Sequence, residues 1–200
     1  MNVPAEQVKL LRQETGAGVL DCRKALESTG GDFDKAVALL REKGLAAAAK
    51  RADRETREGV LDLYSHGDGR VGVMVEVNCE TDFVARTQEF RTFAHEMALQ
   101  IAANSPRWVD VADIPAEVVD HERQEARKRA LEEGKPEKIV DRIVDGRLEK
   151  FYEEYCLLHQ PYIRDDKKNV GQLLQEMIAT TGEKISIRRF TRWTVGEEAE

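Results

Sequence analysis

A chain of 200 residues, 41% of them hydrophobic, can form one ordinary domain and a small second one. The net charge of −7 argues against nucleic acid as the main partner, because proteins that coat nucleic acid usually carry a basic face. The sequence shows neither an apolar run of roughly 20 residues, which a bilayer-spanning helix needs, nor a secretory signal, and this predicts a cytoplasmic protein without a membrane contact.

The three cysteines, Cys22, Cys79 and Cys156, are far apart in the sequence and odd in number. They form neither a disulfide framework nor a paired metal-binding motif. We therefore expect free thiols in a reducing compartment. Because Cys156 falls on a predicted helical seam, the sequence leaves a disulfide between two copies open.

Three short helices are predicted over residues 1–45, since apolar residues recur at helical spacing between glycine-containing breaks. Asp32 is expected as the N-cap of the third helix and Gly44 as its C-terminal stop. A module this small has a marginal core and is more often a binding module than a catalytic one. The alanine-rich and then charged residues 46–58 predict a connecting helix without a wide apolar face.

Residues 59–200 predict an α+β domain, in which an antiparallel sheet is covered by helices. Residues 60–64 and 71–77 predict a hairpin, and four valines at strict period two indicate that one face of it is buried. A lone hairpin is rarely stable, so a third strand near residues 185–195 is expected to complete the sheet.

Two helices with continuous apolar stripes, near residues 90–101 and 170–178, are expected to cover this sheet. Between them, residues 117–159 predict an antiparallel helical hairpin that turns at residues 134–136. Its second helix carries apolar residues alternately four and three positions apart, which is typical of a coiled-coil seam.

The sequence carries no recognisable catalytic constellation. His95 and Glu96 begin like a zinc-protease helix, but the second histidine of that motif is missing. Phosphate-binding loops, dinucleotide-binding glycine motifs and a serine elbow are also absent from the sequence. We therefore expect a binding protein rather than an enzyme, with no cofactor and no metal.

The segment Asn78–Arg86 favours a binding role. It follows the valine-rich strand directly and places an aromatic residue beside a carboxylate at a strand-to-helix corner. Two interpretations stay open. Either Asp82 caps the next helix and Phe83 packs into the core, or the corner projects and Phe83 is a partner anchor, since aromatic residues are enriched at binding hot spots.

Two separate segments resemble the elongation factor Ts family. Glu76–Arg86, which reads EVNCETDFVAR, is similar to the family signature, and so is Leu11–Leu26, which reads LRQETGAGVLDCRKAL. The tail agrees over residues 160–162, 165–171 and 189–196, so the resemblance covers essentially the whole chain. It implies a guanine-nucleotide exchange factor of translation that binds elongation factor Tu, both GDP-bound and nucleotide-free, and promotes GDP release.

The resemblance also implies where the partner binds. The N-terminal module is expected to be ubiquitin-associated-like and to dock on the GTPase domain of the partner. The corner is expected to press into that domain near the magnesium ion and the phosphates, without direct contact to nucleic acid. The implied partner-binding residues are Thr81, Asp82, Phe83, Val84, Arg12, Gly16, Val19, Arg23, Lys24 and His95.

Some features depart from the family pattern. Arg23 stands where many members have lysine, which changes hydrogen-bond geometry, and residues 159–162 read His-Gln-Pro-Tyr instead of the more usual Glu-Gln-Pro-Phe. Longer members carry an extra subdomain between the corner and the following helix. Its absence from this chain motivates the hypothesis of a homodimer that recovers the missing surface.

Two other functions stay open at the level of the sequence. One is a ubiquitin-associated-like adaptor that binds helical peptides and has no exchange activity. The other is an RNA-binding protein associated with the ribosome. Its candidate contacts would be Lys50, Arg51, Arg54, Arg57, Arg188, Arg189 and Arg192.

Overall fold

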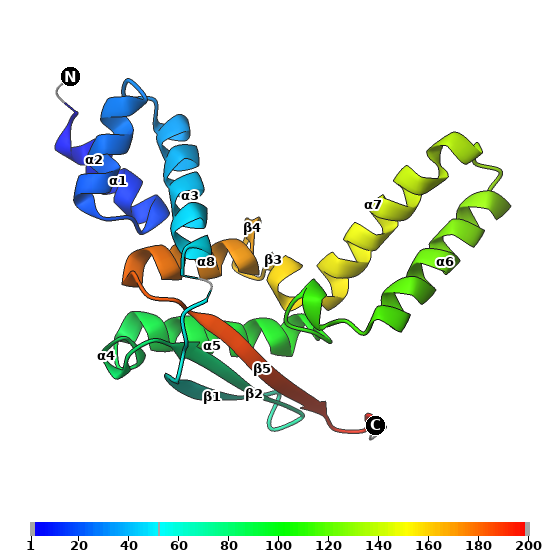
Figure 1. Cartoon of the computed structure of the whole chain (residues 1–200). Helices are drawn as coiled ribbons and strands as arrows, with labels where there is room; N and C mark the ends of the chain where they lie inside the picture. The colour runs from blue at the N-terminus through cyan, green and yellow to red at the C-terminus, as the bar shows by residue number, and fades with distance from the viewer. Residues whose placement is uncertain (1–2, 52, 199–200) are drawn as a thin grey trace. The chain divides into compact units, whose positions relative to one another are not determined.

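The computed structural model describes residues 3–51 and 53–198. It confirms the predicted α+β fold, with a three-stranded antiparallel sheet of order β1–β2–β5 and a separate pair of short strands, β3 and β4. Figure 1 traces the elements along the chain. In order they are α1 (Ala5–Thr15), α2 (Val19–Ser28), α3 (Phe33–Ala49), β1 (Glu58–His66), β2 (Val71–Cys79), α4 (Asp82–Ala85), α5 (Gln88–Asn104), α6 (Ala116–Glu132), α7 (Glu137–Tyr155), β3 (Pro161–Tyr162), β4 (Asp165–Asn169), α8 (Val170–Thr181) and β5 (Ser186–Thr194).

The chain divides into two compact units, each built from segments that are distant in the sequence. The first unit contains the residues up to Leu63, then Val75–Glu96 and Gln172–Arg189. The second contains Tyr64–Met74, Met97–Gly171 and the residues from Phe190 on. The predicted division into a docking module over residues 1–45 and a core domain over residues 59–200 stays a prediction.

In the first unit, α1, α2 and α3 pack around a small apolar core. Asp32 caps α3 as predicted, because its Oδ1 atom accepts a hydrogen bond of 3.1 Å from the backbone N–H of Lys35. The buried members of this core are Val8, Leu11, Cys22, Ala25, Leu26, Ala36, Val37 and Leu40.

Two predictions about the end of α3 are wrong. Gly44 does not stop the helix, which continues to Ala49, and no separate connecting helix is found among the described residues of the range 46–58. Alanine is the best helix former, so the alanine run extends α3 across a single glycine. The charged residues that follow lack an apolar face that could hold a short helix by packing.

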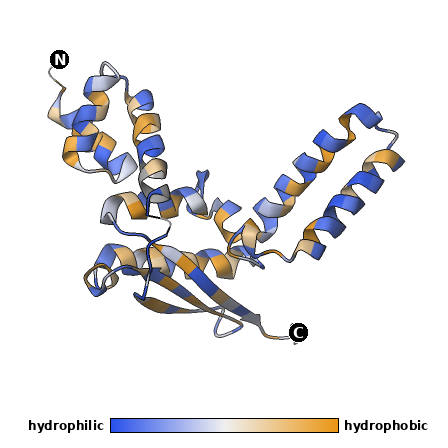
Figure 2. Cartoon of the chain, in the orientation of Figure 1, coloured by the Kyte–Doolittle hydropathy of each residue, from blue (hydrophilic) through white to orange (hydrophobic). Residues whose placement is uncertain are grey.

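The strand β2 follows the predicted period of two, with Val71 half-buried at its start. Val73, Val75 and Val77 of β2 are buried, and the alternation appears in Figure 2 as orange and blue bands along the strands. The turn between β1 and β2 has positive φ angles at the predicted Gly67-Asp68-Gly69. All six apolar residues of the stripe predicted over residues 90–101 are buried in α5.

In the second unit, α6 and α7 form the predicted helical hairpin, drawn from green to yellow in Figure 1. The chain turns at Gly134, whose φ of 71° is the left-handed conformation that favours glycine. The helix α7 ends at Tyr155, earlier than the predicted end at residue 159. Leu158, which the heptad-like spacing assigned to the seam, therefore lies in a short 3₁₀ turn. The buried residues between the helices are Ala126, Ala130, Val140, Val144 and Leu148.

Two buried glutamines tie α5 to the loop after α7, also in the second unit. The Gln100 amide nitrogen donates to Gln160 Oε1 at 3.2 Å and to the Pro161 carbonyl at 3.1 Å. The Gln100 oxygen accepts from the backbone N–H of Ile163 at 2.9 Å, and Gln160 Nε2 donates to the Glu154 carbonyl at 2.8 Å. These contacts give the Gln-Pro part of the loop a structural role.

All three cysteines are free thiols, as predicted, and all three are buried. Burial is the main cause that raises the pKa of Cys79 and of Cys156 to about 11, and it also raises the pKa of Cys22. Because the thiolate is the reactive form, we expect Ellman's reagent at pH 8 to label none of them within minutes in the native protein. All three should react in denaturant.

The same measurement tests the disulfide between two copies. Cys156 is 0% exposed, so its sulfur would have to leave the interior before it could pair with another chain. Fast labelling of one thiol in the native state, or a dimer band on a non-reducing gel, would contradict the burial of these side chains.

Candidate functional site

The corner after β2 is a single helical turn, α4, and Thr81 is its N-cap. The Thr81 hydroxyl accepts a hydrogen bond from the backbone N–H of Val84 at 3.4 Å. The interpretation in which Asp82 caps this helix is therefore wrong. Asp82 is the first helical residue, where a carboxylate also suits the positive end of the helix dipole, and it pairs with Arg86 at 2.9 Å.

Phe83 projects from this turn into solvent. Its side chain is 81% exposed, whereas Ala85, two residues on, is buried. The interpretation that places Phe83 in the core is thus wrong, and the alternative of a projecting corner describes the geometry. Such an exposed aromatic side chain offers a large apolar surface that a partner could cover.

Two glutamates that sequence reasoning missed hold the start of the corner. Glu183, in the loop between α8 and β5, accepts hydrogen bonds from the backbone N–H groups of Glu80 and Thr81, each at 3.1 Å. Glu80 in turn accepts from the backbone N–H of Lys184 at 2.6 Å and pairs with Arg54 at 3.2 Å. The contacts between Glu80 or Thr81 and the Glu183–Lys184 loop join residues about a hundred positions apart, so no local pattern in the sequence could have indicated them.

The electrostatics of Glu80 follow from these donors. The Lys184 N–H first, and Arg54 after it, hold the pKa of Glu80 below its ordinary value. The ionised Glu80 carboxylate therefore makes its full contribution to the free energy of unfolding above the ordinary pKa of about 4.5. This contribution is lost as the pH falls through the lowered pKa of the folded protein. The anchoring of the corner is thus intact at neutral pH.

The remaining predicted residue near the sheet, His95, lies on α5 in the first unit. Its side chain is exposed, and its Nδ1 atom is 3.1 Å from Asp62 Oδ1 on β1. This contact connects α5 to the edge strand of the sheet and orients the imidazole ring. A contact between His95 and a partner stays a prediction.

The other five predicted residues, Arg12, Gly16, Val19, Arg23 and Lys24, lie around the turn between α1 and α2. Gly16 ends α1 with a φ of 67°, and its N–H donates to the Arg12 carbonyl at 2.8 Å. Arg12, Arg23 and Lys24 have exposed side chains.

An exposed apolar pair accompanies these cations at the start of α2. Val19 is 51% exposed and Leu20 is 70% exposed. Leu20 lies within the segment Leu11–Leu26 that resembles the family, but it is not among the predicted site residues. The helical spacing of the apolar residues did not indicate that this leucine would be exposed. Arg23 forms an exposed ion pair of 3.0 Å with Glu27, which costs little to break.

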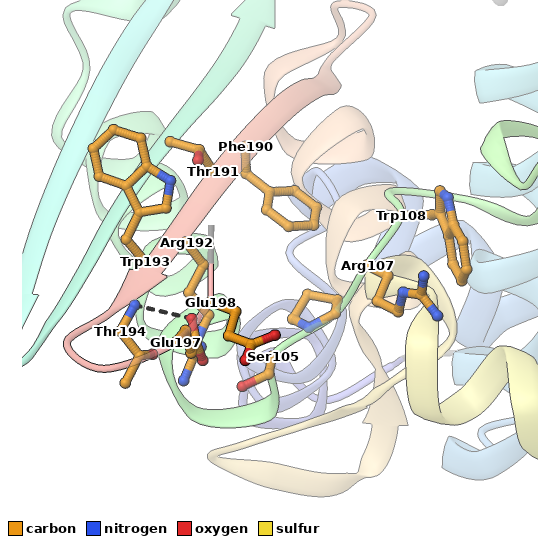
Figure 3. A pocket seen from close by; sticks show the side chains of 11 residues that line it. Ser105, Arg107, Trp108, Phe190, Thr191, Arg192, Trp193, Thr194, Glu197 and Glu198 are labelled. Carbon is orange, nitrogen blue, oxygen red and sulfur yellow. Dashed lines mark hydrogen bonds and ion pairs between the residues drawn. The ribbon is translucent and has the colours of Figure 1, made fainter. Parts of the chain in front are cut away.

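The structure also has an open pocket of about 1000 Å³ in the second unit, shown in Figure 3, which none of the ten predicted residues lines. Arg107 lies over the ring of Trp108 at 4.5 Å, and Arg192 pairs with Glu197 at 3.0 Å. The charge of Arg192 is thus balanced by a carboxylate within the pocket, whereas Arg107 is stacked on an aromatic ring.

The arginines of the RNA-binding alternative are mostly paired with carboxylates. Arg188 and Arg189 both reach Glu76, Arg189 at 2.7 Å. Arg54, Arg57 and Arg192 also form ion pairs. Exposed pairs can open, but a surface that neutralises its own cations does not form the basic stripe that phosphate binding requires.

Within residues 3–51 and 53–198, no three metal-ligating side chains gather into a group that could hold an ion. In the same part of the chain, none of the helices is both long and apolar enough to cross a membrane.

Comparisons with known proteins show the family to which this chain belongs. The sequence model of a family described as "Elongation factor TS" matches residues 23–197. This places the chain among the elongation factors of protein synthesis. It belongs to the elongation factor Ts family.

Individual relatives match nearly end to end. A protein named "Elongation factor Ts" from Caldanaerobacter subterraneus is 57% identical over 198 residues, which cover 99% of each chain. Relatives of the same name from Acetivibrio thermocellus and Coprothermobacter proteolyticus are 56% and 54% identical over 98% of this chain, and the matches cover 91% and 100% of their own lengths. This chain, in which α5 follows the corner closely, therefore has nearly the same length as these relatives.

Proposed function

We propose that this chain is a guanine-nucleotide exchange factor, which binds elongation factor Tu in its GDP-bound and nucleotide-free forms and promotes GDP release. The observation that carries the proposal is the Thr81–Val84 corner, where the family signature holds Phe83 81% exposed on an anchored helical turn. The Asp82 side chain beside it is 43% exposed and forms a surface ion pair with Arg86.

The energies agree with such a role. An acceleration of about a thousandfold requires a relative barrier lowering of roughly 4 kcal/mol. Burial of one phenylalanine contributes about 1.5–3 kcal/mol, so Phe83 supplies a large share and other contacts supply the rest. Mg²⁺ demands near-ideal octahedral geometry, so a small displacement of the partner's backbone by Phe83 and Asp82 is enough to weaken its hold on the ion.

No bond is made or broken by this chain in the proposed mechanism, so it is not an enzyme in the chemical sense. If the factor weakens the binding of GDP to the partner, then GDP weakens the binding of the factor to the partner by the same ratio. The complex of all three components is therefore short-lived, and the nucleotide-free pair is tight.

The helical module would supply a second docking surface. Val19 and Leu20 expose an apolar pair flanked by Arg12, Arg23 and Lys24, which suits a mixed apolar and acidic surface on the GTPase domain. A homodimer stays a hypothesis from chain length, and a monomeric mass by sedimentation at micromolar concentration would contradict it. A cytoplasmic location without nucleic-acid or membrane contacts is part of the same proposal.

The test is to preload elongation factor Tu with fluorescent GDP and to follow its release with and without this protein. We expect strong acceleration at substoichiometric amounts, since an exchange factor turns over. A folded protein that binds the partner but leaves the release rate unchanged would favour the adaptor alternative.

A further inference from the structure

The corner that carries Phe83 is too short to hold its own shape. The helix α4 has four residues, and its N-cap side chain accepts a long hydrogen bond of 3.4 Å. One isolated helical turn is unstable in water, because nucleation fixes several backbone angles for one hydrogen bond. An exposed Phe83 on such a turn needs an external support if it is to point outward before a partner arrives.

Glu183 provides that support through three contacts. One carboxylate oxygen accepts the backbone N–H groups of Glu80 and Thr81, each at 3.1 Å, and the other accepts the Thr81 hydroxyl at 2.6 Å. All three contacts are made by one side chain, so Glu183 holds both the backbone and the cap of the corner. Because the hydroxyl donates its hydrogen to Glu183, its lone pairs are left to accept from the N–H of Val84, which sets the N-cap.

The corner and the loop after α8 support each other, because each segment accepts backbone hydrogen bonds from the other. Glu80, at the start of the corner, accepts the backbone N–H of Lys184, the residue next to Glu183. Arg54 places one nitrogen 3.2 Å from each oxygen of Glu80, and Lys184 Nζ donates to the Arg54 carbonyl at 2.9 Å. The corner and the loop after α8 are therefore linked in both directions, and Arg54 from the segment before β1 is bonded to both.

We propose that Glu183 is a positioning residue of the exchange reaction, which holds the Thr81–Val84 corner in its docking geometry in the free protein. The inference rests on the proposed exchange function. Glu183 contacts the backbone and the cap rather than Asp82 or Phe83, so it acts through the corner. If the corner is competent for only about a tenth of the time once the support is lost, the apparent affinity falls about tenfold.

Two substitutions separate geometry from charge. Glu183→Gln removes the charge but keeps the reach, since its carbonyl can accept both backbone N–H groups while its amide donates to the Thr81 hydroxyl. Glu183→Asp keeps the charge but is one methylene shorter, so it cannot make all three contacts. Positioning predicts that the Gln variant stays within about threefold of the wild type, whereas the Asp and Ala variants lose about tenfold in kcat/KM.

The loss should appear in KM, the partner concentration at half-maximal exchange rate, with kcat nearly unchanged, because a saturating partner pulls the corner into place. The amide hydrogens of Val84 and Ala85 should exchange faster with solvent in the Asp and Ala variants. A retained activity of the Asp variant together with a loss in the Gln variant would show that the charge matters and would overturn the proposal. So would full activity of the Ala variant beside an active wild type.

A double-mutant cycle completes the test. If Glu183 acts through the Phe83 corner, Glu183→Ala added to Phe83→Ala should lower the exchange rate by much less than tenfold further. Fully additive losses would show a general structural effect and contradict positioning. If Glu183→Ala does not fold, the Gln and Asp pair still decides the question. A wild-type protein that does not accelerate GDP release would overturn the exchange function itself, and this inference with it.

Discussion

Replacement of Phe83 by alanine should lower the second-order rate constant for GDP release about 10- to 100-fold. The reason is the apolar burial of about 1.5–3 kcal/mol that the side chain would gain only in the complex, at 1.4 kcal/mol for each factor of ten. The stability of the free protein should hardly change, because Phe83 is 81% exposed and surface substitutions usually alter it by less than about 0.5 kcal/mol. Stopped-flow release of fluorescent GDP, together with a melting curve, measures both quantities.

Leu131→Ala is the matched control. Leu131 is another exposed apolar side chain, 50% exposed on α6, and lies in the other compact unit. Its loss should leave both exchange and melting temperature close to the wild type. Equal losses of exchange in the two variants would show that the effect comes from a general loss of apolar surface rather than from the corner.

The sheet and the helix α5 could be predicted from the sequence because their signals are local. In β2 the exposed Met74 lies between the buried Val73 and Val75, and the apolar stripe of α5 repeats at helical spacing, so the spacing of the apolar residues indicates which side chains are buried. The strands β3 and β4 were missed for the same reason: β3 has two residues, and β4 reads Asp-Asp-Lys-Lys-Asn, which has no apolar alternation.

The corner could be located from the sequence but not resolved. A phenylalanine two residues after a helix cap fits a buried helix face and a projecting turn equally well, so only the three-dimensional path of the chain decides between them. The support from Glu183 depends on a contact with Thr81 across about a hundred residues. A single glutamate in a glycine-containing loop carries no periodic signal, and its partners are backbone groups that every residue has.

Gly59→Ala should destabilise the protein by about 3–5 kcal/mol, in the range of the largest single-residue effects. Gly59 lies on β1 with a φ of 155°, and a Cβ atom there would come 2.2 Å from the Val77 carbonyl oxygen and 2.8 Å from the Cα atom of Asn78. Both atoms are backbone, so no side-chain rotation can relieve the clash. Urea denaturation followed by circular dichroism measures the loss of unfolding free energy.

Gly72→Ala is the control variant for Gly59→Ala. Gly72 lies on the neighbouring strand β2 and has no atom within 4 Å of an added Cβ, so its stability should change by less than about 1 kcal/mol. A mild effect at both positions would contradict the close approach of β1 to β2. Asn78 Nδ2 also donates to the Glu58 carbonyl at 3.3 Å, and this contact joins β1 to β2 rather than to the Thr81–Val84 corner. Gly59→Ala should therefore lose exchange activity only as it unfolds, whereas Glu183→Ala should lose it while the fold persists.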